Sequence, residues 1–184
     1  MGKTELAKQL AKYLFDSEDA LLRLDMSEFM EKIAMTRIVG SSPGYVGFED
    51  ANFLDKIRRK PYSVVLFDEI EKAHSDIFNL FLQVLDDGHM TDSHGRKVSF
   101  KNCVILMTSN VGTKVIKDFG SGVGFSTKAK IESKDNSVKS TLEKELKKKF
   151  SPEFINRLDE IIYFKDLDKE DIFKIVQLEI NNFV

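Results

Sequence analysis

A short run of apolar residues that ends in two adjacent carboxylates constrains the fold of this chain more than any other segment. Residues 61–70 read PYSVVLFDEI, so that Asp68 and Glu69 directly follow four apolar side chains. A run of this length, bounded by proline and by charge, is typical of a strand buried on both faces of a parallel sheet. Carboxylates at the carboxyl end of such a strand lie where open α/β sheets bind ligands.

The tripeptide Gly2-Lys3-Thr4 suggests which ligand these acids serve. It matches the end of a phosphate-binding loop, G-x-x-x-x-G-K-[ST], and a helical pattern begins directly after it. In that setting Asp68 binds Mg²⁺ together with Thr4, while Glu69 polarises the water that attacks a γ-phosphate. Each feature alone has a simpler explanation, either a chance tripeptide or two solvated acids at a strand end. Their combination favours ATP and Mg²⁺ as ligands.

Apolar runs and helical patterns alternate along the chain, which predicts an α/β fold, a three-layer sandwich with a mostly parallel sheet. Besides the acid-tipped run, we expect strands over 20–25, 102–108 and 160–164 and a hairpin over 89–100. We expect helices over 4–15, 27–39, 52–60, 75–86, 138–150 and 168–183. Glycine-rich stretches predict loops over 40–47 and 120–137, the second of them mobile.

The composition limits the classes of partner. The chain has 184 residues, 42% of them hydrophobic and 32% charged, which is enough for one globular domain with a core. A net charge of −2 gives no overall basic field for nucleic acid, so no nucleic-acid partner is expected. No apolar segment approaches the ~20 residues that span a bilayer, and no membrane partner is expected either. The single cysteine is compatible with a cytoplasmic location.

Two further polar residues are candidates for the site. Asn110 follows the predicted strand at 102–108, where its amide can orient the attacking water, although asparagine more often caps a helix or forms a turn. Arg157 follows a short helix and has two readings that spacing cannot separate. It either pairs with Asp159 or Glu160, or reaches the nucleotide of a neighbouring subunit as an arginine finger.

An aromatic residue between glycines stands out in the first predicted loop. Tyr45 is flanked by Gly44, Val46 and Gly47, and glycines add backbone freedom without packing. The simpler interpretation is an exposed turn with a locally packed tyrosine. The functional interpretation is a mobile aromatic side chain that grips another molecule.

Together these segments closely resemble the second ATPase domain of the Clp family of AAA+ unfoldases and disaggregases, with a ClpC-like member favoured over ClpE-like or ClpB-like ones. The similarity runs in order along nearly the whole chain, through residues 2–7, 24–29, 43–47, 58–88, 107–110 and 151–160. It implies a P-loop NTPase fold, the large subdomain of an AAA+ protein, with ATP and Mg²⁺ as cofactors.

The resemblance also implies roles for individual residues. Asp68 and Glu69 become the Walker B pair, Asn110 the sensor residue, and Arg157 a finger that acts across a subunit interface. The loop Gly44, Tyr45, Val46 and Gly47 becomes the pore loop of a homo-hexameric ring that threads unfolded or tagged protein substrates. An aromatic ring suits that task because it grips chains of any sequence.

A second loop bears on the choice within the family. Val123, Gly124 and Phe125 resemble the tip with which ClpC-like unfoldases dock on the ClpP peptidase, and adaptor proteins are further expected partners. An exposed apolar tip on a polar loop fits a docking plug. The alternatives are that Phe125 tucks into its own domain, and that the protein is a stand-alone disaggregase.

The departures from the family pattern lead to an expectation about length. The first glycine of the phosphate loop and its strand, which is central in the family's sheet, are missing, and so is the small subdomain toward which 166–184 leads. We therefore expect 1–184 to be a large-subdomain fragment truncated at both ends, and inactive in isolation. A nucleic-acid-handling AAA+ ATPase and a non-catalytic interaction module remain as alternative functions.

Overall fold

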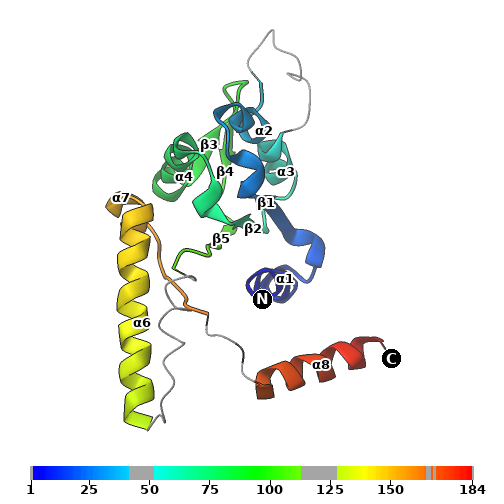
Figure 1. Ribbon diagram of the computed structural model, residues 1–184. Helices are drawn as coiled ribbons and strands as arrows, with labels where there is room; N and C mark the ends of the chain where they lie inside the picture. Colours follow the sequence, from blue (N-terminus) through cyan, green and yellow to red (C-terminus); the bar gives the residue numbers. More distant parts are fainter. Residues whose placement is uncertain (1, 42–51, 113–127, 165–166, 168, 184) are drawn as a thin grey trace.

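A parallel sheet of three strands lies at the centre of the described structure (Figure 1). The computed structural model describes residues 2–41, 52–112, 128–164, 167 and 169–183. The strands are β1 (Leu21–Asp25), β2 (Ser63–Asp68) and β5 (Cys103–Met107), in the order β1–β2–β5. All three were expected from their apolar runs, and β2 is buried along its whole length. The α/β fold with a mostly parallel sheet is confirmed.

The register of the sheet brings the carboxyl ends of the strands together. Asp25 lies opposite Asp68 in the β1–β2 pair, and Phe67 lies opposite Met107 in the β2–β5 pair. Because the strands are parallel, the residues that follow them emerge at one edge of the sheet. The candidate site residues after β2 and β5 are therefore neighbours.

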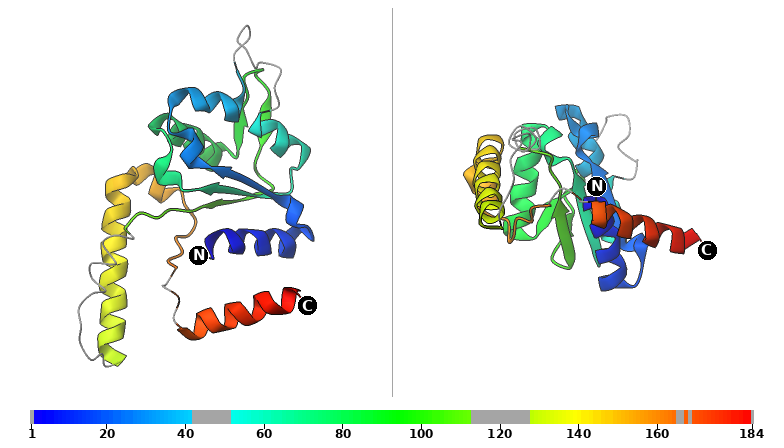
Figure 2. Two further views of the ribbon diagram at one scale, coloured as in Figure 1. Left: turned by 45° about the vertical axis from the view of Figure 1, so that its right-hand side comes forward. Right: turned by 60° about the horizontal axis from the view of Figure 1, so that its bottom comes forward.

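Helices cover both faces of the sheet, as Figure 2 shows for α1 on one side. Helix α1 (Lys3–Phe15) packs through Ala11 against Val64 of β2. The other face carries α2 (Thr36–Val39), α3 (Phe53–Arg59), α4 (Ser75–Asp87) and the hairpin of β3 (His89–Thr91) and β4 (Lys97–Ser99). Short 3₁₀ turns lie on the connections at Met26–Phe29, Lys32–Met35 and Ile70–Lys72, and a further one, Glu18–Ala20, packs with α1. The three layers agree with the expected sandwich.

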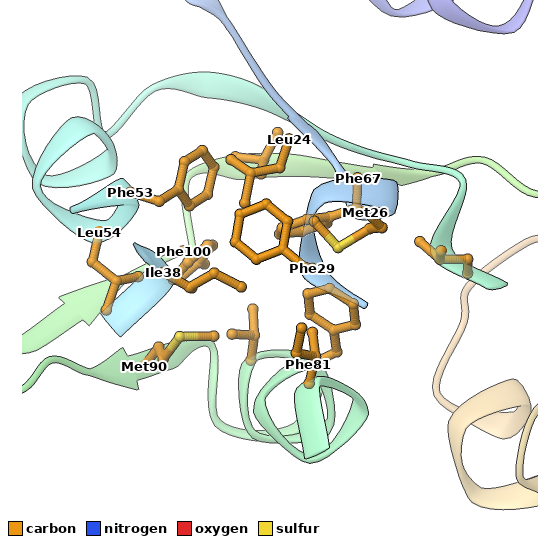
Figure 3. Close-up of a cluster of buried hydrophobic side chains, with 14 of the residues drawn as sticks. Leu24, Met26, Phe29, Ile38, Phe53, Leu54, Phe67, Phe81, Met90 and Phe100 are labelled. Atoms are coloured by element: carbon orange, nitrogen blue, oxygen red, sulfur yellow. The ribbon is translucent and has the colours of Figure 1, made fainter. Parts of the chain in front are cut away.

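A series of phenylalanine rings joins β2 to the helices on the second face (Figure 3). The Phe67 ring lies 6.1 Å from that of Phe53 in α3 and 4.5 Å from that of Phe81 in α4, measured between centroids. Phe78 continues the series to Phe154 of α7 (Pro152–Asn156) at 5.4 Å, edge to face. Such pairs stabilise beyond the area they bury. The series therefore fixes α4 and α7 relative to the acid-tipped strand.

Three predicted elements differ from the structure. The expected helix over 27–39 is two 3₁₀ turns and a short α2, because the Asp25 carboxylate caps the Ser27 amide and starts a tight turn early. Helix α6 (Lys128–Lys149) begins well before residue 138, so the last part of the predicted loop 120–137 is helical. His74, rather than Ser75, supplies the side chain that caps α4.

The expected strand over 160–164 is also wrong. The backbone there belongs to no ladder, and Ile162 and Phe164 are exposed. A strand needs a hydrogen-bonding neighbour, and among the described residues this segment has none. Helix α8 (Lys169–Phe183) follows and lies apart from the sheet, on the side of α1 (Figure 2). Within the described helices, no apolar stretch is long enough to cross a membrane.

Replacing Gly40 by alanine should destabilise the fold by about 3 kcal/mol, since its backbone conformation is one that essentially only glycine adopts. Gly40 has φ 95° and ψ 159°, and an added Cβ would lie 2.4 Å from Ser93 Oγ and 2.8 Å from Asn52 Nδ2. Gly95→Ala is the matched control. Gly95 also has positive φ, but a Cβ there meets nothing within 4 Å, so only about 1 kcal/mol is expected. Urea unfolding of both variants measures the difference, and equal losses would contradict the steric argument.

Candidate active site

Asp68, at the end of β2, is held by two neighbours from the adjoining strands. The Arg23 Nη2 atom of β1 lies 2.6 Å from Asp68 Oδ2 as a salt bridge, and the Thr108 hydroxyl after β5 donates to Asp68 Oδ1. The Asp68 side chain is largely buried, while that of Arg23 is about half exposed. These two contacts fix the direction of the carboxylate at the edge of the sheet.

Glu69 follows in a left-handed backbone conformation that non-glycine residues rarely adopt. Its φ is 57° and its ψ 48°. The conformation is stabilised by Thr108, whose hydroxyl accepts the Glu69 amide at 3.1 Å and whose carbonyl accepts the Ile70 amide at 3.0 Å. Strain of this kind costs of order 1–3 kcal/mol and tends to occur at functional sites. Here it turns the Glu69 side chain toward the end of β5.

A hydrogen-bonded chain links the start of α1 to Glu69 through Asn110. Lys3 Nζ donates to Asn110 Oδ1 at 2.8 Å and also to the Ser109 carbonyl. Asn110 Nδ2 donates to Glu69 Oε1 at 3.1 Å. Both ends of the asparagine amide are thus used, which fixes its orientation. Residues more than a hundred positions apart in sequence meet at one point.

A second glutamate, Glu71, binds the backbone of Asn110. Glu71 Oε1 accepts the Asn110 backbone amide at 3.1 Å. Its other oxygen, Oε2, is buried, and the described residues offer it no hydrogen-bond partner. The Glu71 carboxylate thereby anchors the turn that carries the asparagine, at the cost of one unsatisfied buried oxygen.

Arg157 lies on a different part of the surface. It forms ion pairs with Asp86 at the end of α4 and with Glu153 of α7, the latter at 3.8 Å. An ion pair of Arg157 with Asp159 or Glu160 was one expectation from the sequence, but neither residue is among its described partners. Within this chain, no described contact joins Arg157 to the cluster at the strand ends. Its side chain is 40% exposed and accessible to another molecule.

Comparison with known proteins identifies the family. The model for the AAA domain (Cdc48 subfamily) matches residues 1–161. The chain belongs to this AAA domain family. It is 55% identical over 184 residues to the ATP-dependent Clp protease ATP-binding subunit ClpC of Staphylococcus saprophyticus, which covers 98% of the chain and 22% of that protein. It is 52% identical over 179 residues to the chaperone protein ClpB of Clostridium tetani, which covers 97% of the chain and 20% of that protein.

A solved structure shows the same relationship in three dimensions. The closed state of Hsp104 with ATPγS and FITC casein matches this AAA domain with a TM-score of 0.83 and 38% identity, over 99% of this chain and 30% of that one. The resemblance to Clp ATPases that the motifs indicated is thus confirmed. The chain spans about a fifth of the length of the two curated relatives.

The oxygen atoms at the strand ends of this AAA domain fit Mg²⁺. The Asp68 carboxylate already binds a cationic group, and the Thr108 hydroxyl beside it is a second hard oxygen. Mg²⁺ is bound by one or two protein groups, with waters and phosphates completing its shell. Accordingly, no cluster of three or more His, Cys, Asp or Glu suited to a metal is needed, and none is present in the described part. Thr4 lies in the first turn of α1 without a described hydrogen bond to Asp68.

Gly2 begins α1 with a conformation suited to a phosphate turn. It has φ 97° and ψ −29°, and its carbonyl accepts the Leu6 amide at 2.8 Å. The first turn of α1 therefore directs free amides toward the edge of the sheet where Lys3 lies.

Two sets of expected residues cannot be placed. The loop of Gly44, Tyr45, Val46 and Gly47 and the tip of Val123, Gly124 and Phe125 lie outside the described residues. Their roles remain predictions.

Three residues of the site, Arg23, Thr108 and Glu71, were not predicted from the sequence. Arg23 is a charged residue within an apolar strand, LLRLD, which is a signal in itself. Its partner could not be inferred, because that depends on the register of β1 against β2. Thr108 lies two residues before Asn110, and Glu71 lies two residues after Glu69. Their hydrogen bonds to the site depend on the geometry of the turns, which the sequence does not give.

Proposed function

We propose that this chain is the ATP-hydrolysing domain of a Clp-type protein-remodelling machine. The observation that carries the proposal is the chain of hydrogen bonds from Lys3 through Asn110 to Glu69, next to Asp68. It places a phosphate-binding cation, a neutral amide and a carboxylate base at one edge of a parallel sheet. These are the parts that phosphoryl transfer to water requires.

Each residue has a separate task in this reaction. The amides of the first turn after Gly2, with Lys3 Nζ, would bind the phosphates. Thr4 and Asp68 would hold Mg²⁺, which would offset the charge of the phosphates. Glu69 accepts a proton from the attacking water, and Asn110 orients that water and Glu69 together. The geometry supports these roles, since Glu69 and Asn110 are already joined at 3.1 Å.

The machine we propose is a homo-hexamer that threads unfolded or tagged proteins. Arg157 would act on the nucleotide of the next subunit, which its exposure permits. Tyr45, between Gly44 and Val46-Gly47, would grip the substrate chain. The matched structure of Hsp104 with FITC casein supports a protein substrate. A cytoplasmic location accords with these tasks.

The finer role is to feed a ClpP-type peptidase, with adaptor proteins delivering substrates. This part rests on Val123, Gly124 and Phe125 as a docking tip. Identity alone does not separate the two roles, because the ClpC and ClpB relatives match at 55% and 52%. A stand-alone disaggregase is the alternative that the ClpB match favours.

ATP turnover by the protein in its natural length should rise several-fold on addition of unfolded casein and stay unchanged with DNA. A protein substrate that enters the pore promotes hydrolysis, whereas these 184 residues, with a net charge of −2, offer DNA no attractive field. A coupled phosphate-release assay measures both. Stimulation by DNA alone would contradict the proposal.

A second experiment separates the peptidase-linked role from the disaggregase. If the protein feeds ClpP, fluorescent casein should be degraded when ClpP is added, and this degradation should be lost in Phe125→Ala.

A further inference from the structure

Arg23 provides a positive charge at the position where the proposed site needs a metal ion. Its guanidinium lies 2.6 Å from Asp68 Oδ2, and Asp68 is the carboxylate assigned to Mg²⁺. A divalent cation and a guanidinium compete for the same carboxylate, because each screens its charge from the other. A metal ion that binds Asp68 Oδ2 displaces this contact of Arg23.

A second carboxylate lies within reach of Arg23. Asp25 Oδ2 is 4.0 Å from Arg23 Nη2, two residues along the same strand. The Ser27 hydroxyl and amide both donate to Asp25 Oδ1 and hold the pKa of that carboxyl below its usual value, so it stays ionised. A cleft of about 310 Å³ borders Arg23 and Asp25 and leaves room for the side chain to move.

We propose that Arg23 is a positioning residue that pairs with Asp68 in the absence of metal and moves to Asp25 when Mg²⁺ binds. The inference rests on the proposed function, because it takes Asp68 as the carboxylate of the nucleotide site. While the metal is absent, Arg23 holds the Asp68 carboxylate directed at the edge of the sheet. Asp25 then receives the guanidinium, so that no charge is left unpaired.

Removal of Arg23 changes the affinity for the metal in opposite directions under this proposal and under a purely structural role. If Arg23 competes with the metal, its removal makes metal binding tighter. If it merely supports the strand, its removal loosens the site and makes metal binding weaker. For a half-exposed pair, an interaction of about 1 kcal/mol corresponds to a change of roughly fivefold in affinity.

The test is a calorimetric titration of Mg²⁺ into the natural-length protein saturated with ADP, with Mn²⁺ EPR as a second reading. We expect Arg23→Gln to lower the dissociation constant of the metal about fivefold. Arg23→Lys keeps the charge and should stay within about twofold of the unchanged protein. Arg37→Gln is the matched control, since Arg37 pairs with Glu28 at 2.7 Å without contacting Asp68. It removes the same charge from the neighbouring surface and should have no effect.

A second variant tests the destination of Arg23. Asp25→Asn removes the carboxylate that receives the guanidinium, so metal binding should weaken several-fold, and this loss should disappear in the double variant with Arg23→Gln. Unchanged or weaker metal binding in Arg23→Gln overturns the proposal. If both single variants bind metal like the unchanged protein, it is overturned as well.

The outcomes separate this inference from the proposed function. If the unchanged protein binds ADP and Mg²⁺ but Arg23→Gln has no effect, only the role of Arg23 fails. If Asp68→Ala leaves binding of both ligands intact, the site itself has been misplaced and the proposed function fails.

Discussion

Replacing Glu69 by glutamine should lower kcat for ATP hydrolysis by about 10²–10⁴-fold and leave nucleotide affinity nearly unchanged. The factor is the usual contribution of a positioned general base. Glutamine has the same shape, and its amide oxygen can still accept from Asn110 Nδ2, which lies 3.1 Å from Glu69 Oε1. The backbone turn is held by Thr108 rather than by the Glu69 side chain, so it should survive. Steady-state turnover and equilibrium ADP binding measure the two effects.

The control for this variant is Glu18→Gln. Glu18 is an exposed glutamate that pairs with Lys12 at 3.6 Å, away from the strand ends, and its loss should alter neither quantity. A Glu69→Gln protein with normal turnover would show that another group takes the proton. A variant that also fails to bind nucleotide would point to a structural role instead.

Replacing Asn110 by alanine should reduce kcat about 100-fold, the usual loss when one positioned donor is removed from a reacting centre. Asn110 Oδ1 accepts from Lys3 and its Nδ2 donates to Glu69, so the variant breaks both contacts, while Lys3 keeps the Ser109 carbonyl. The Glu71 contact is made by the backbone amide of residue 110 and should remain. Turnover should fall far more than ADP affinity, because the charge of Lys3 is kept and the proposed task of Asn110 is to orient the attacking water.

Asn79→Ala is the matched control, an exposed asparagine of α4 remote from the site. We expect no change in turnover from it. If Asn110→Ala lowered turnover no more than Asn79→Ala, the chain of hydrogen bonds from Lys3 to Glu69 would be incidental to hydrolysis.

Strands β2 and β5 could be predicted from the sequence because each is an apolar run of a length typical of strands. Ser63–Asp68 and Cys103–Met107 were found almost residue for residue. The segment 160–164 has similar residues but failed, since a strand exists only where a partner supplies hydrogen bonds. Local sequence indicates the capacity to form a strand but not the presence of its neighbour.

For the site, too, residues could be predicted from local motifs, whereas contacts between distant segments could not. Lys3, Asp68, Glu69 and Asn110 were chosen from motifs, and the structure brings them together. The left-handed turn at Glu69 and the pairing of Arg23 with Asp68 could not be foreseen. The first depends on Thr108 from another strand, and the second on the register of β1. The role of Arg157 as an arginine finger requires a neighbouring subunit, so the structure of one chain does not test it.

The most direct test of the account is a cryo-EM structure of the Glu69→Gln protein, in its natural length, with Mg–ATP. We predict the γ-phosphate within hydrogen-bonding distance of Lys3 Nζ, and the residue 69 side chain facing it beside Asn110. We also predict Mg²⁺ between the phosphates and Asp68. Nucleotide bound elsewhere, or bound while Lys3 and Asp68 keep all their present partners, would contradict the assignment of this edge of the sheet as the site of hydrolysis.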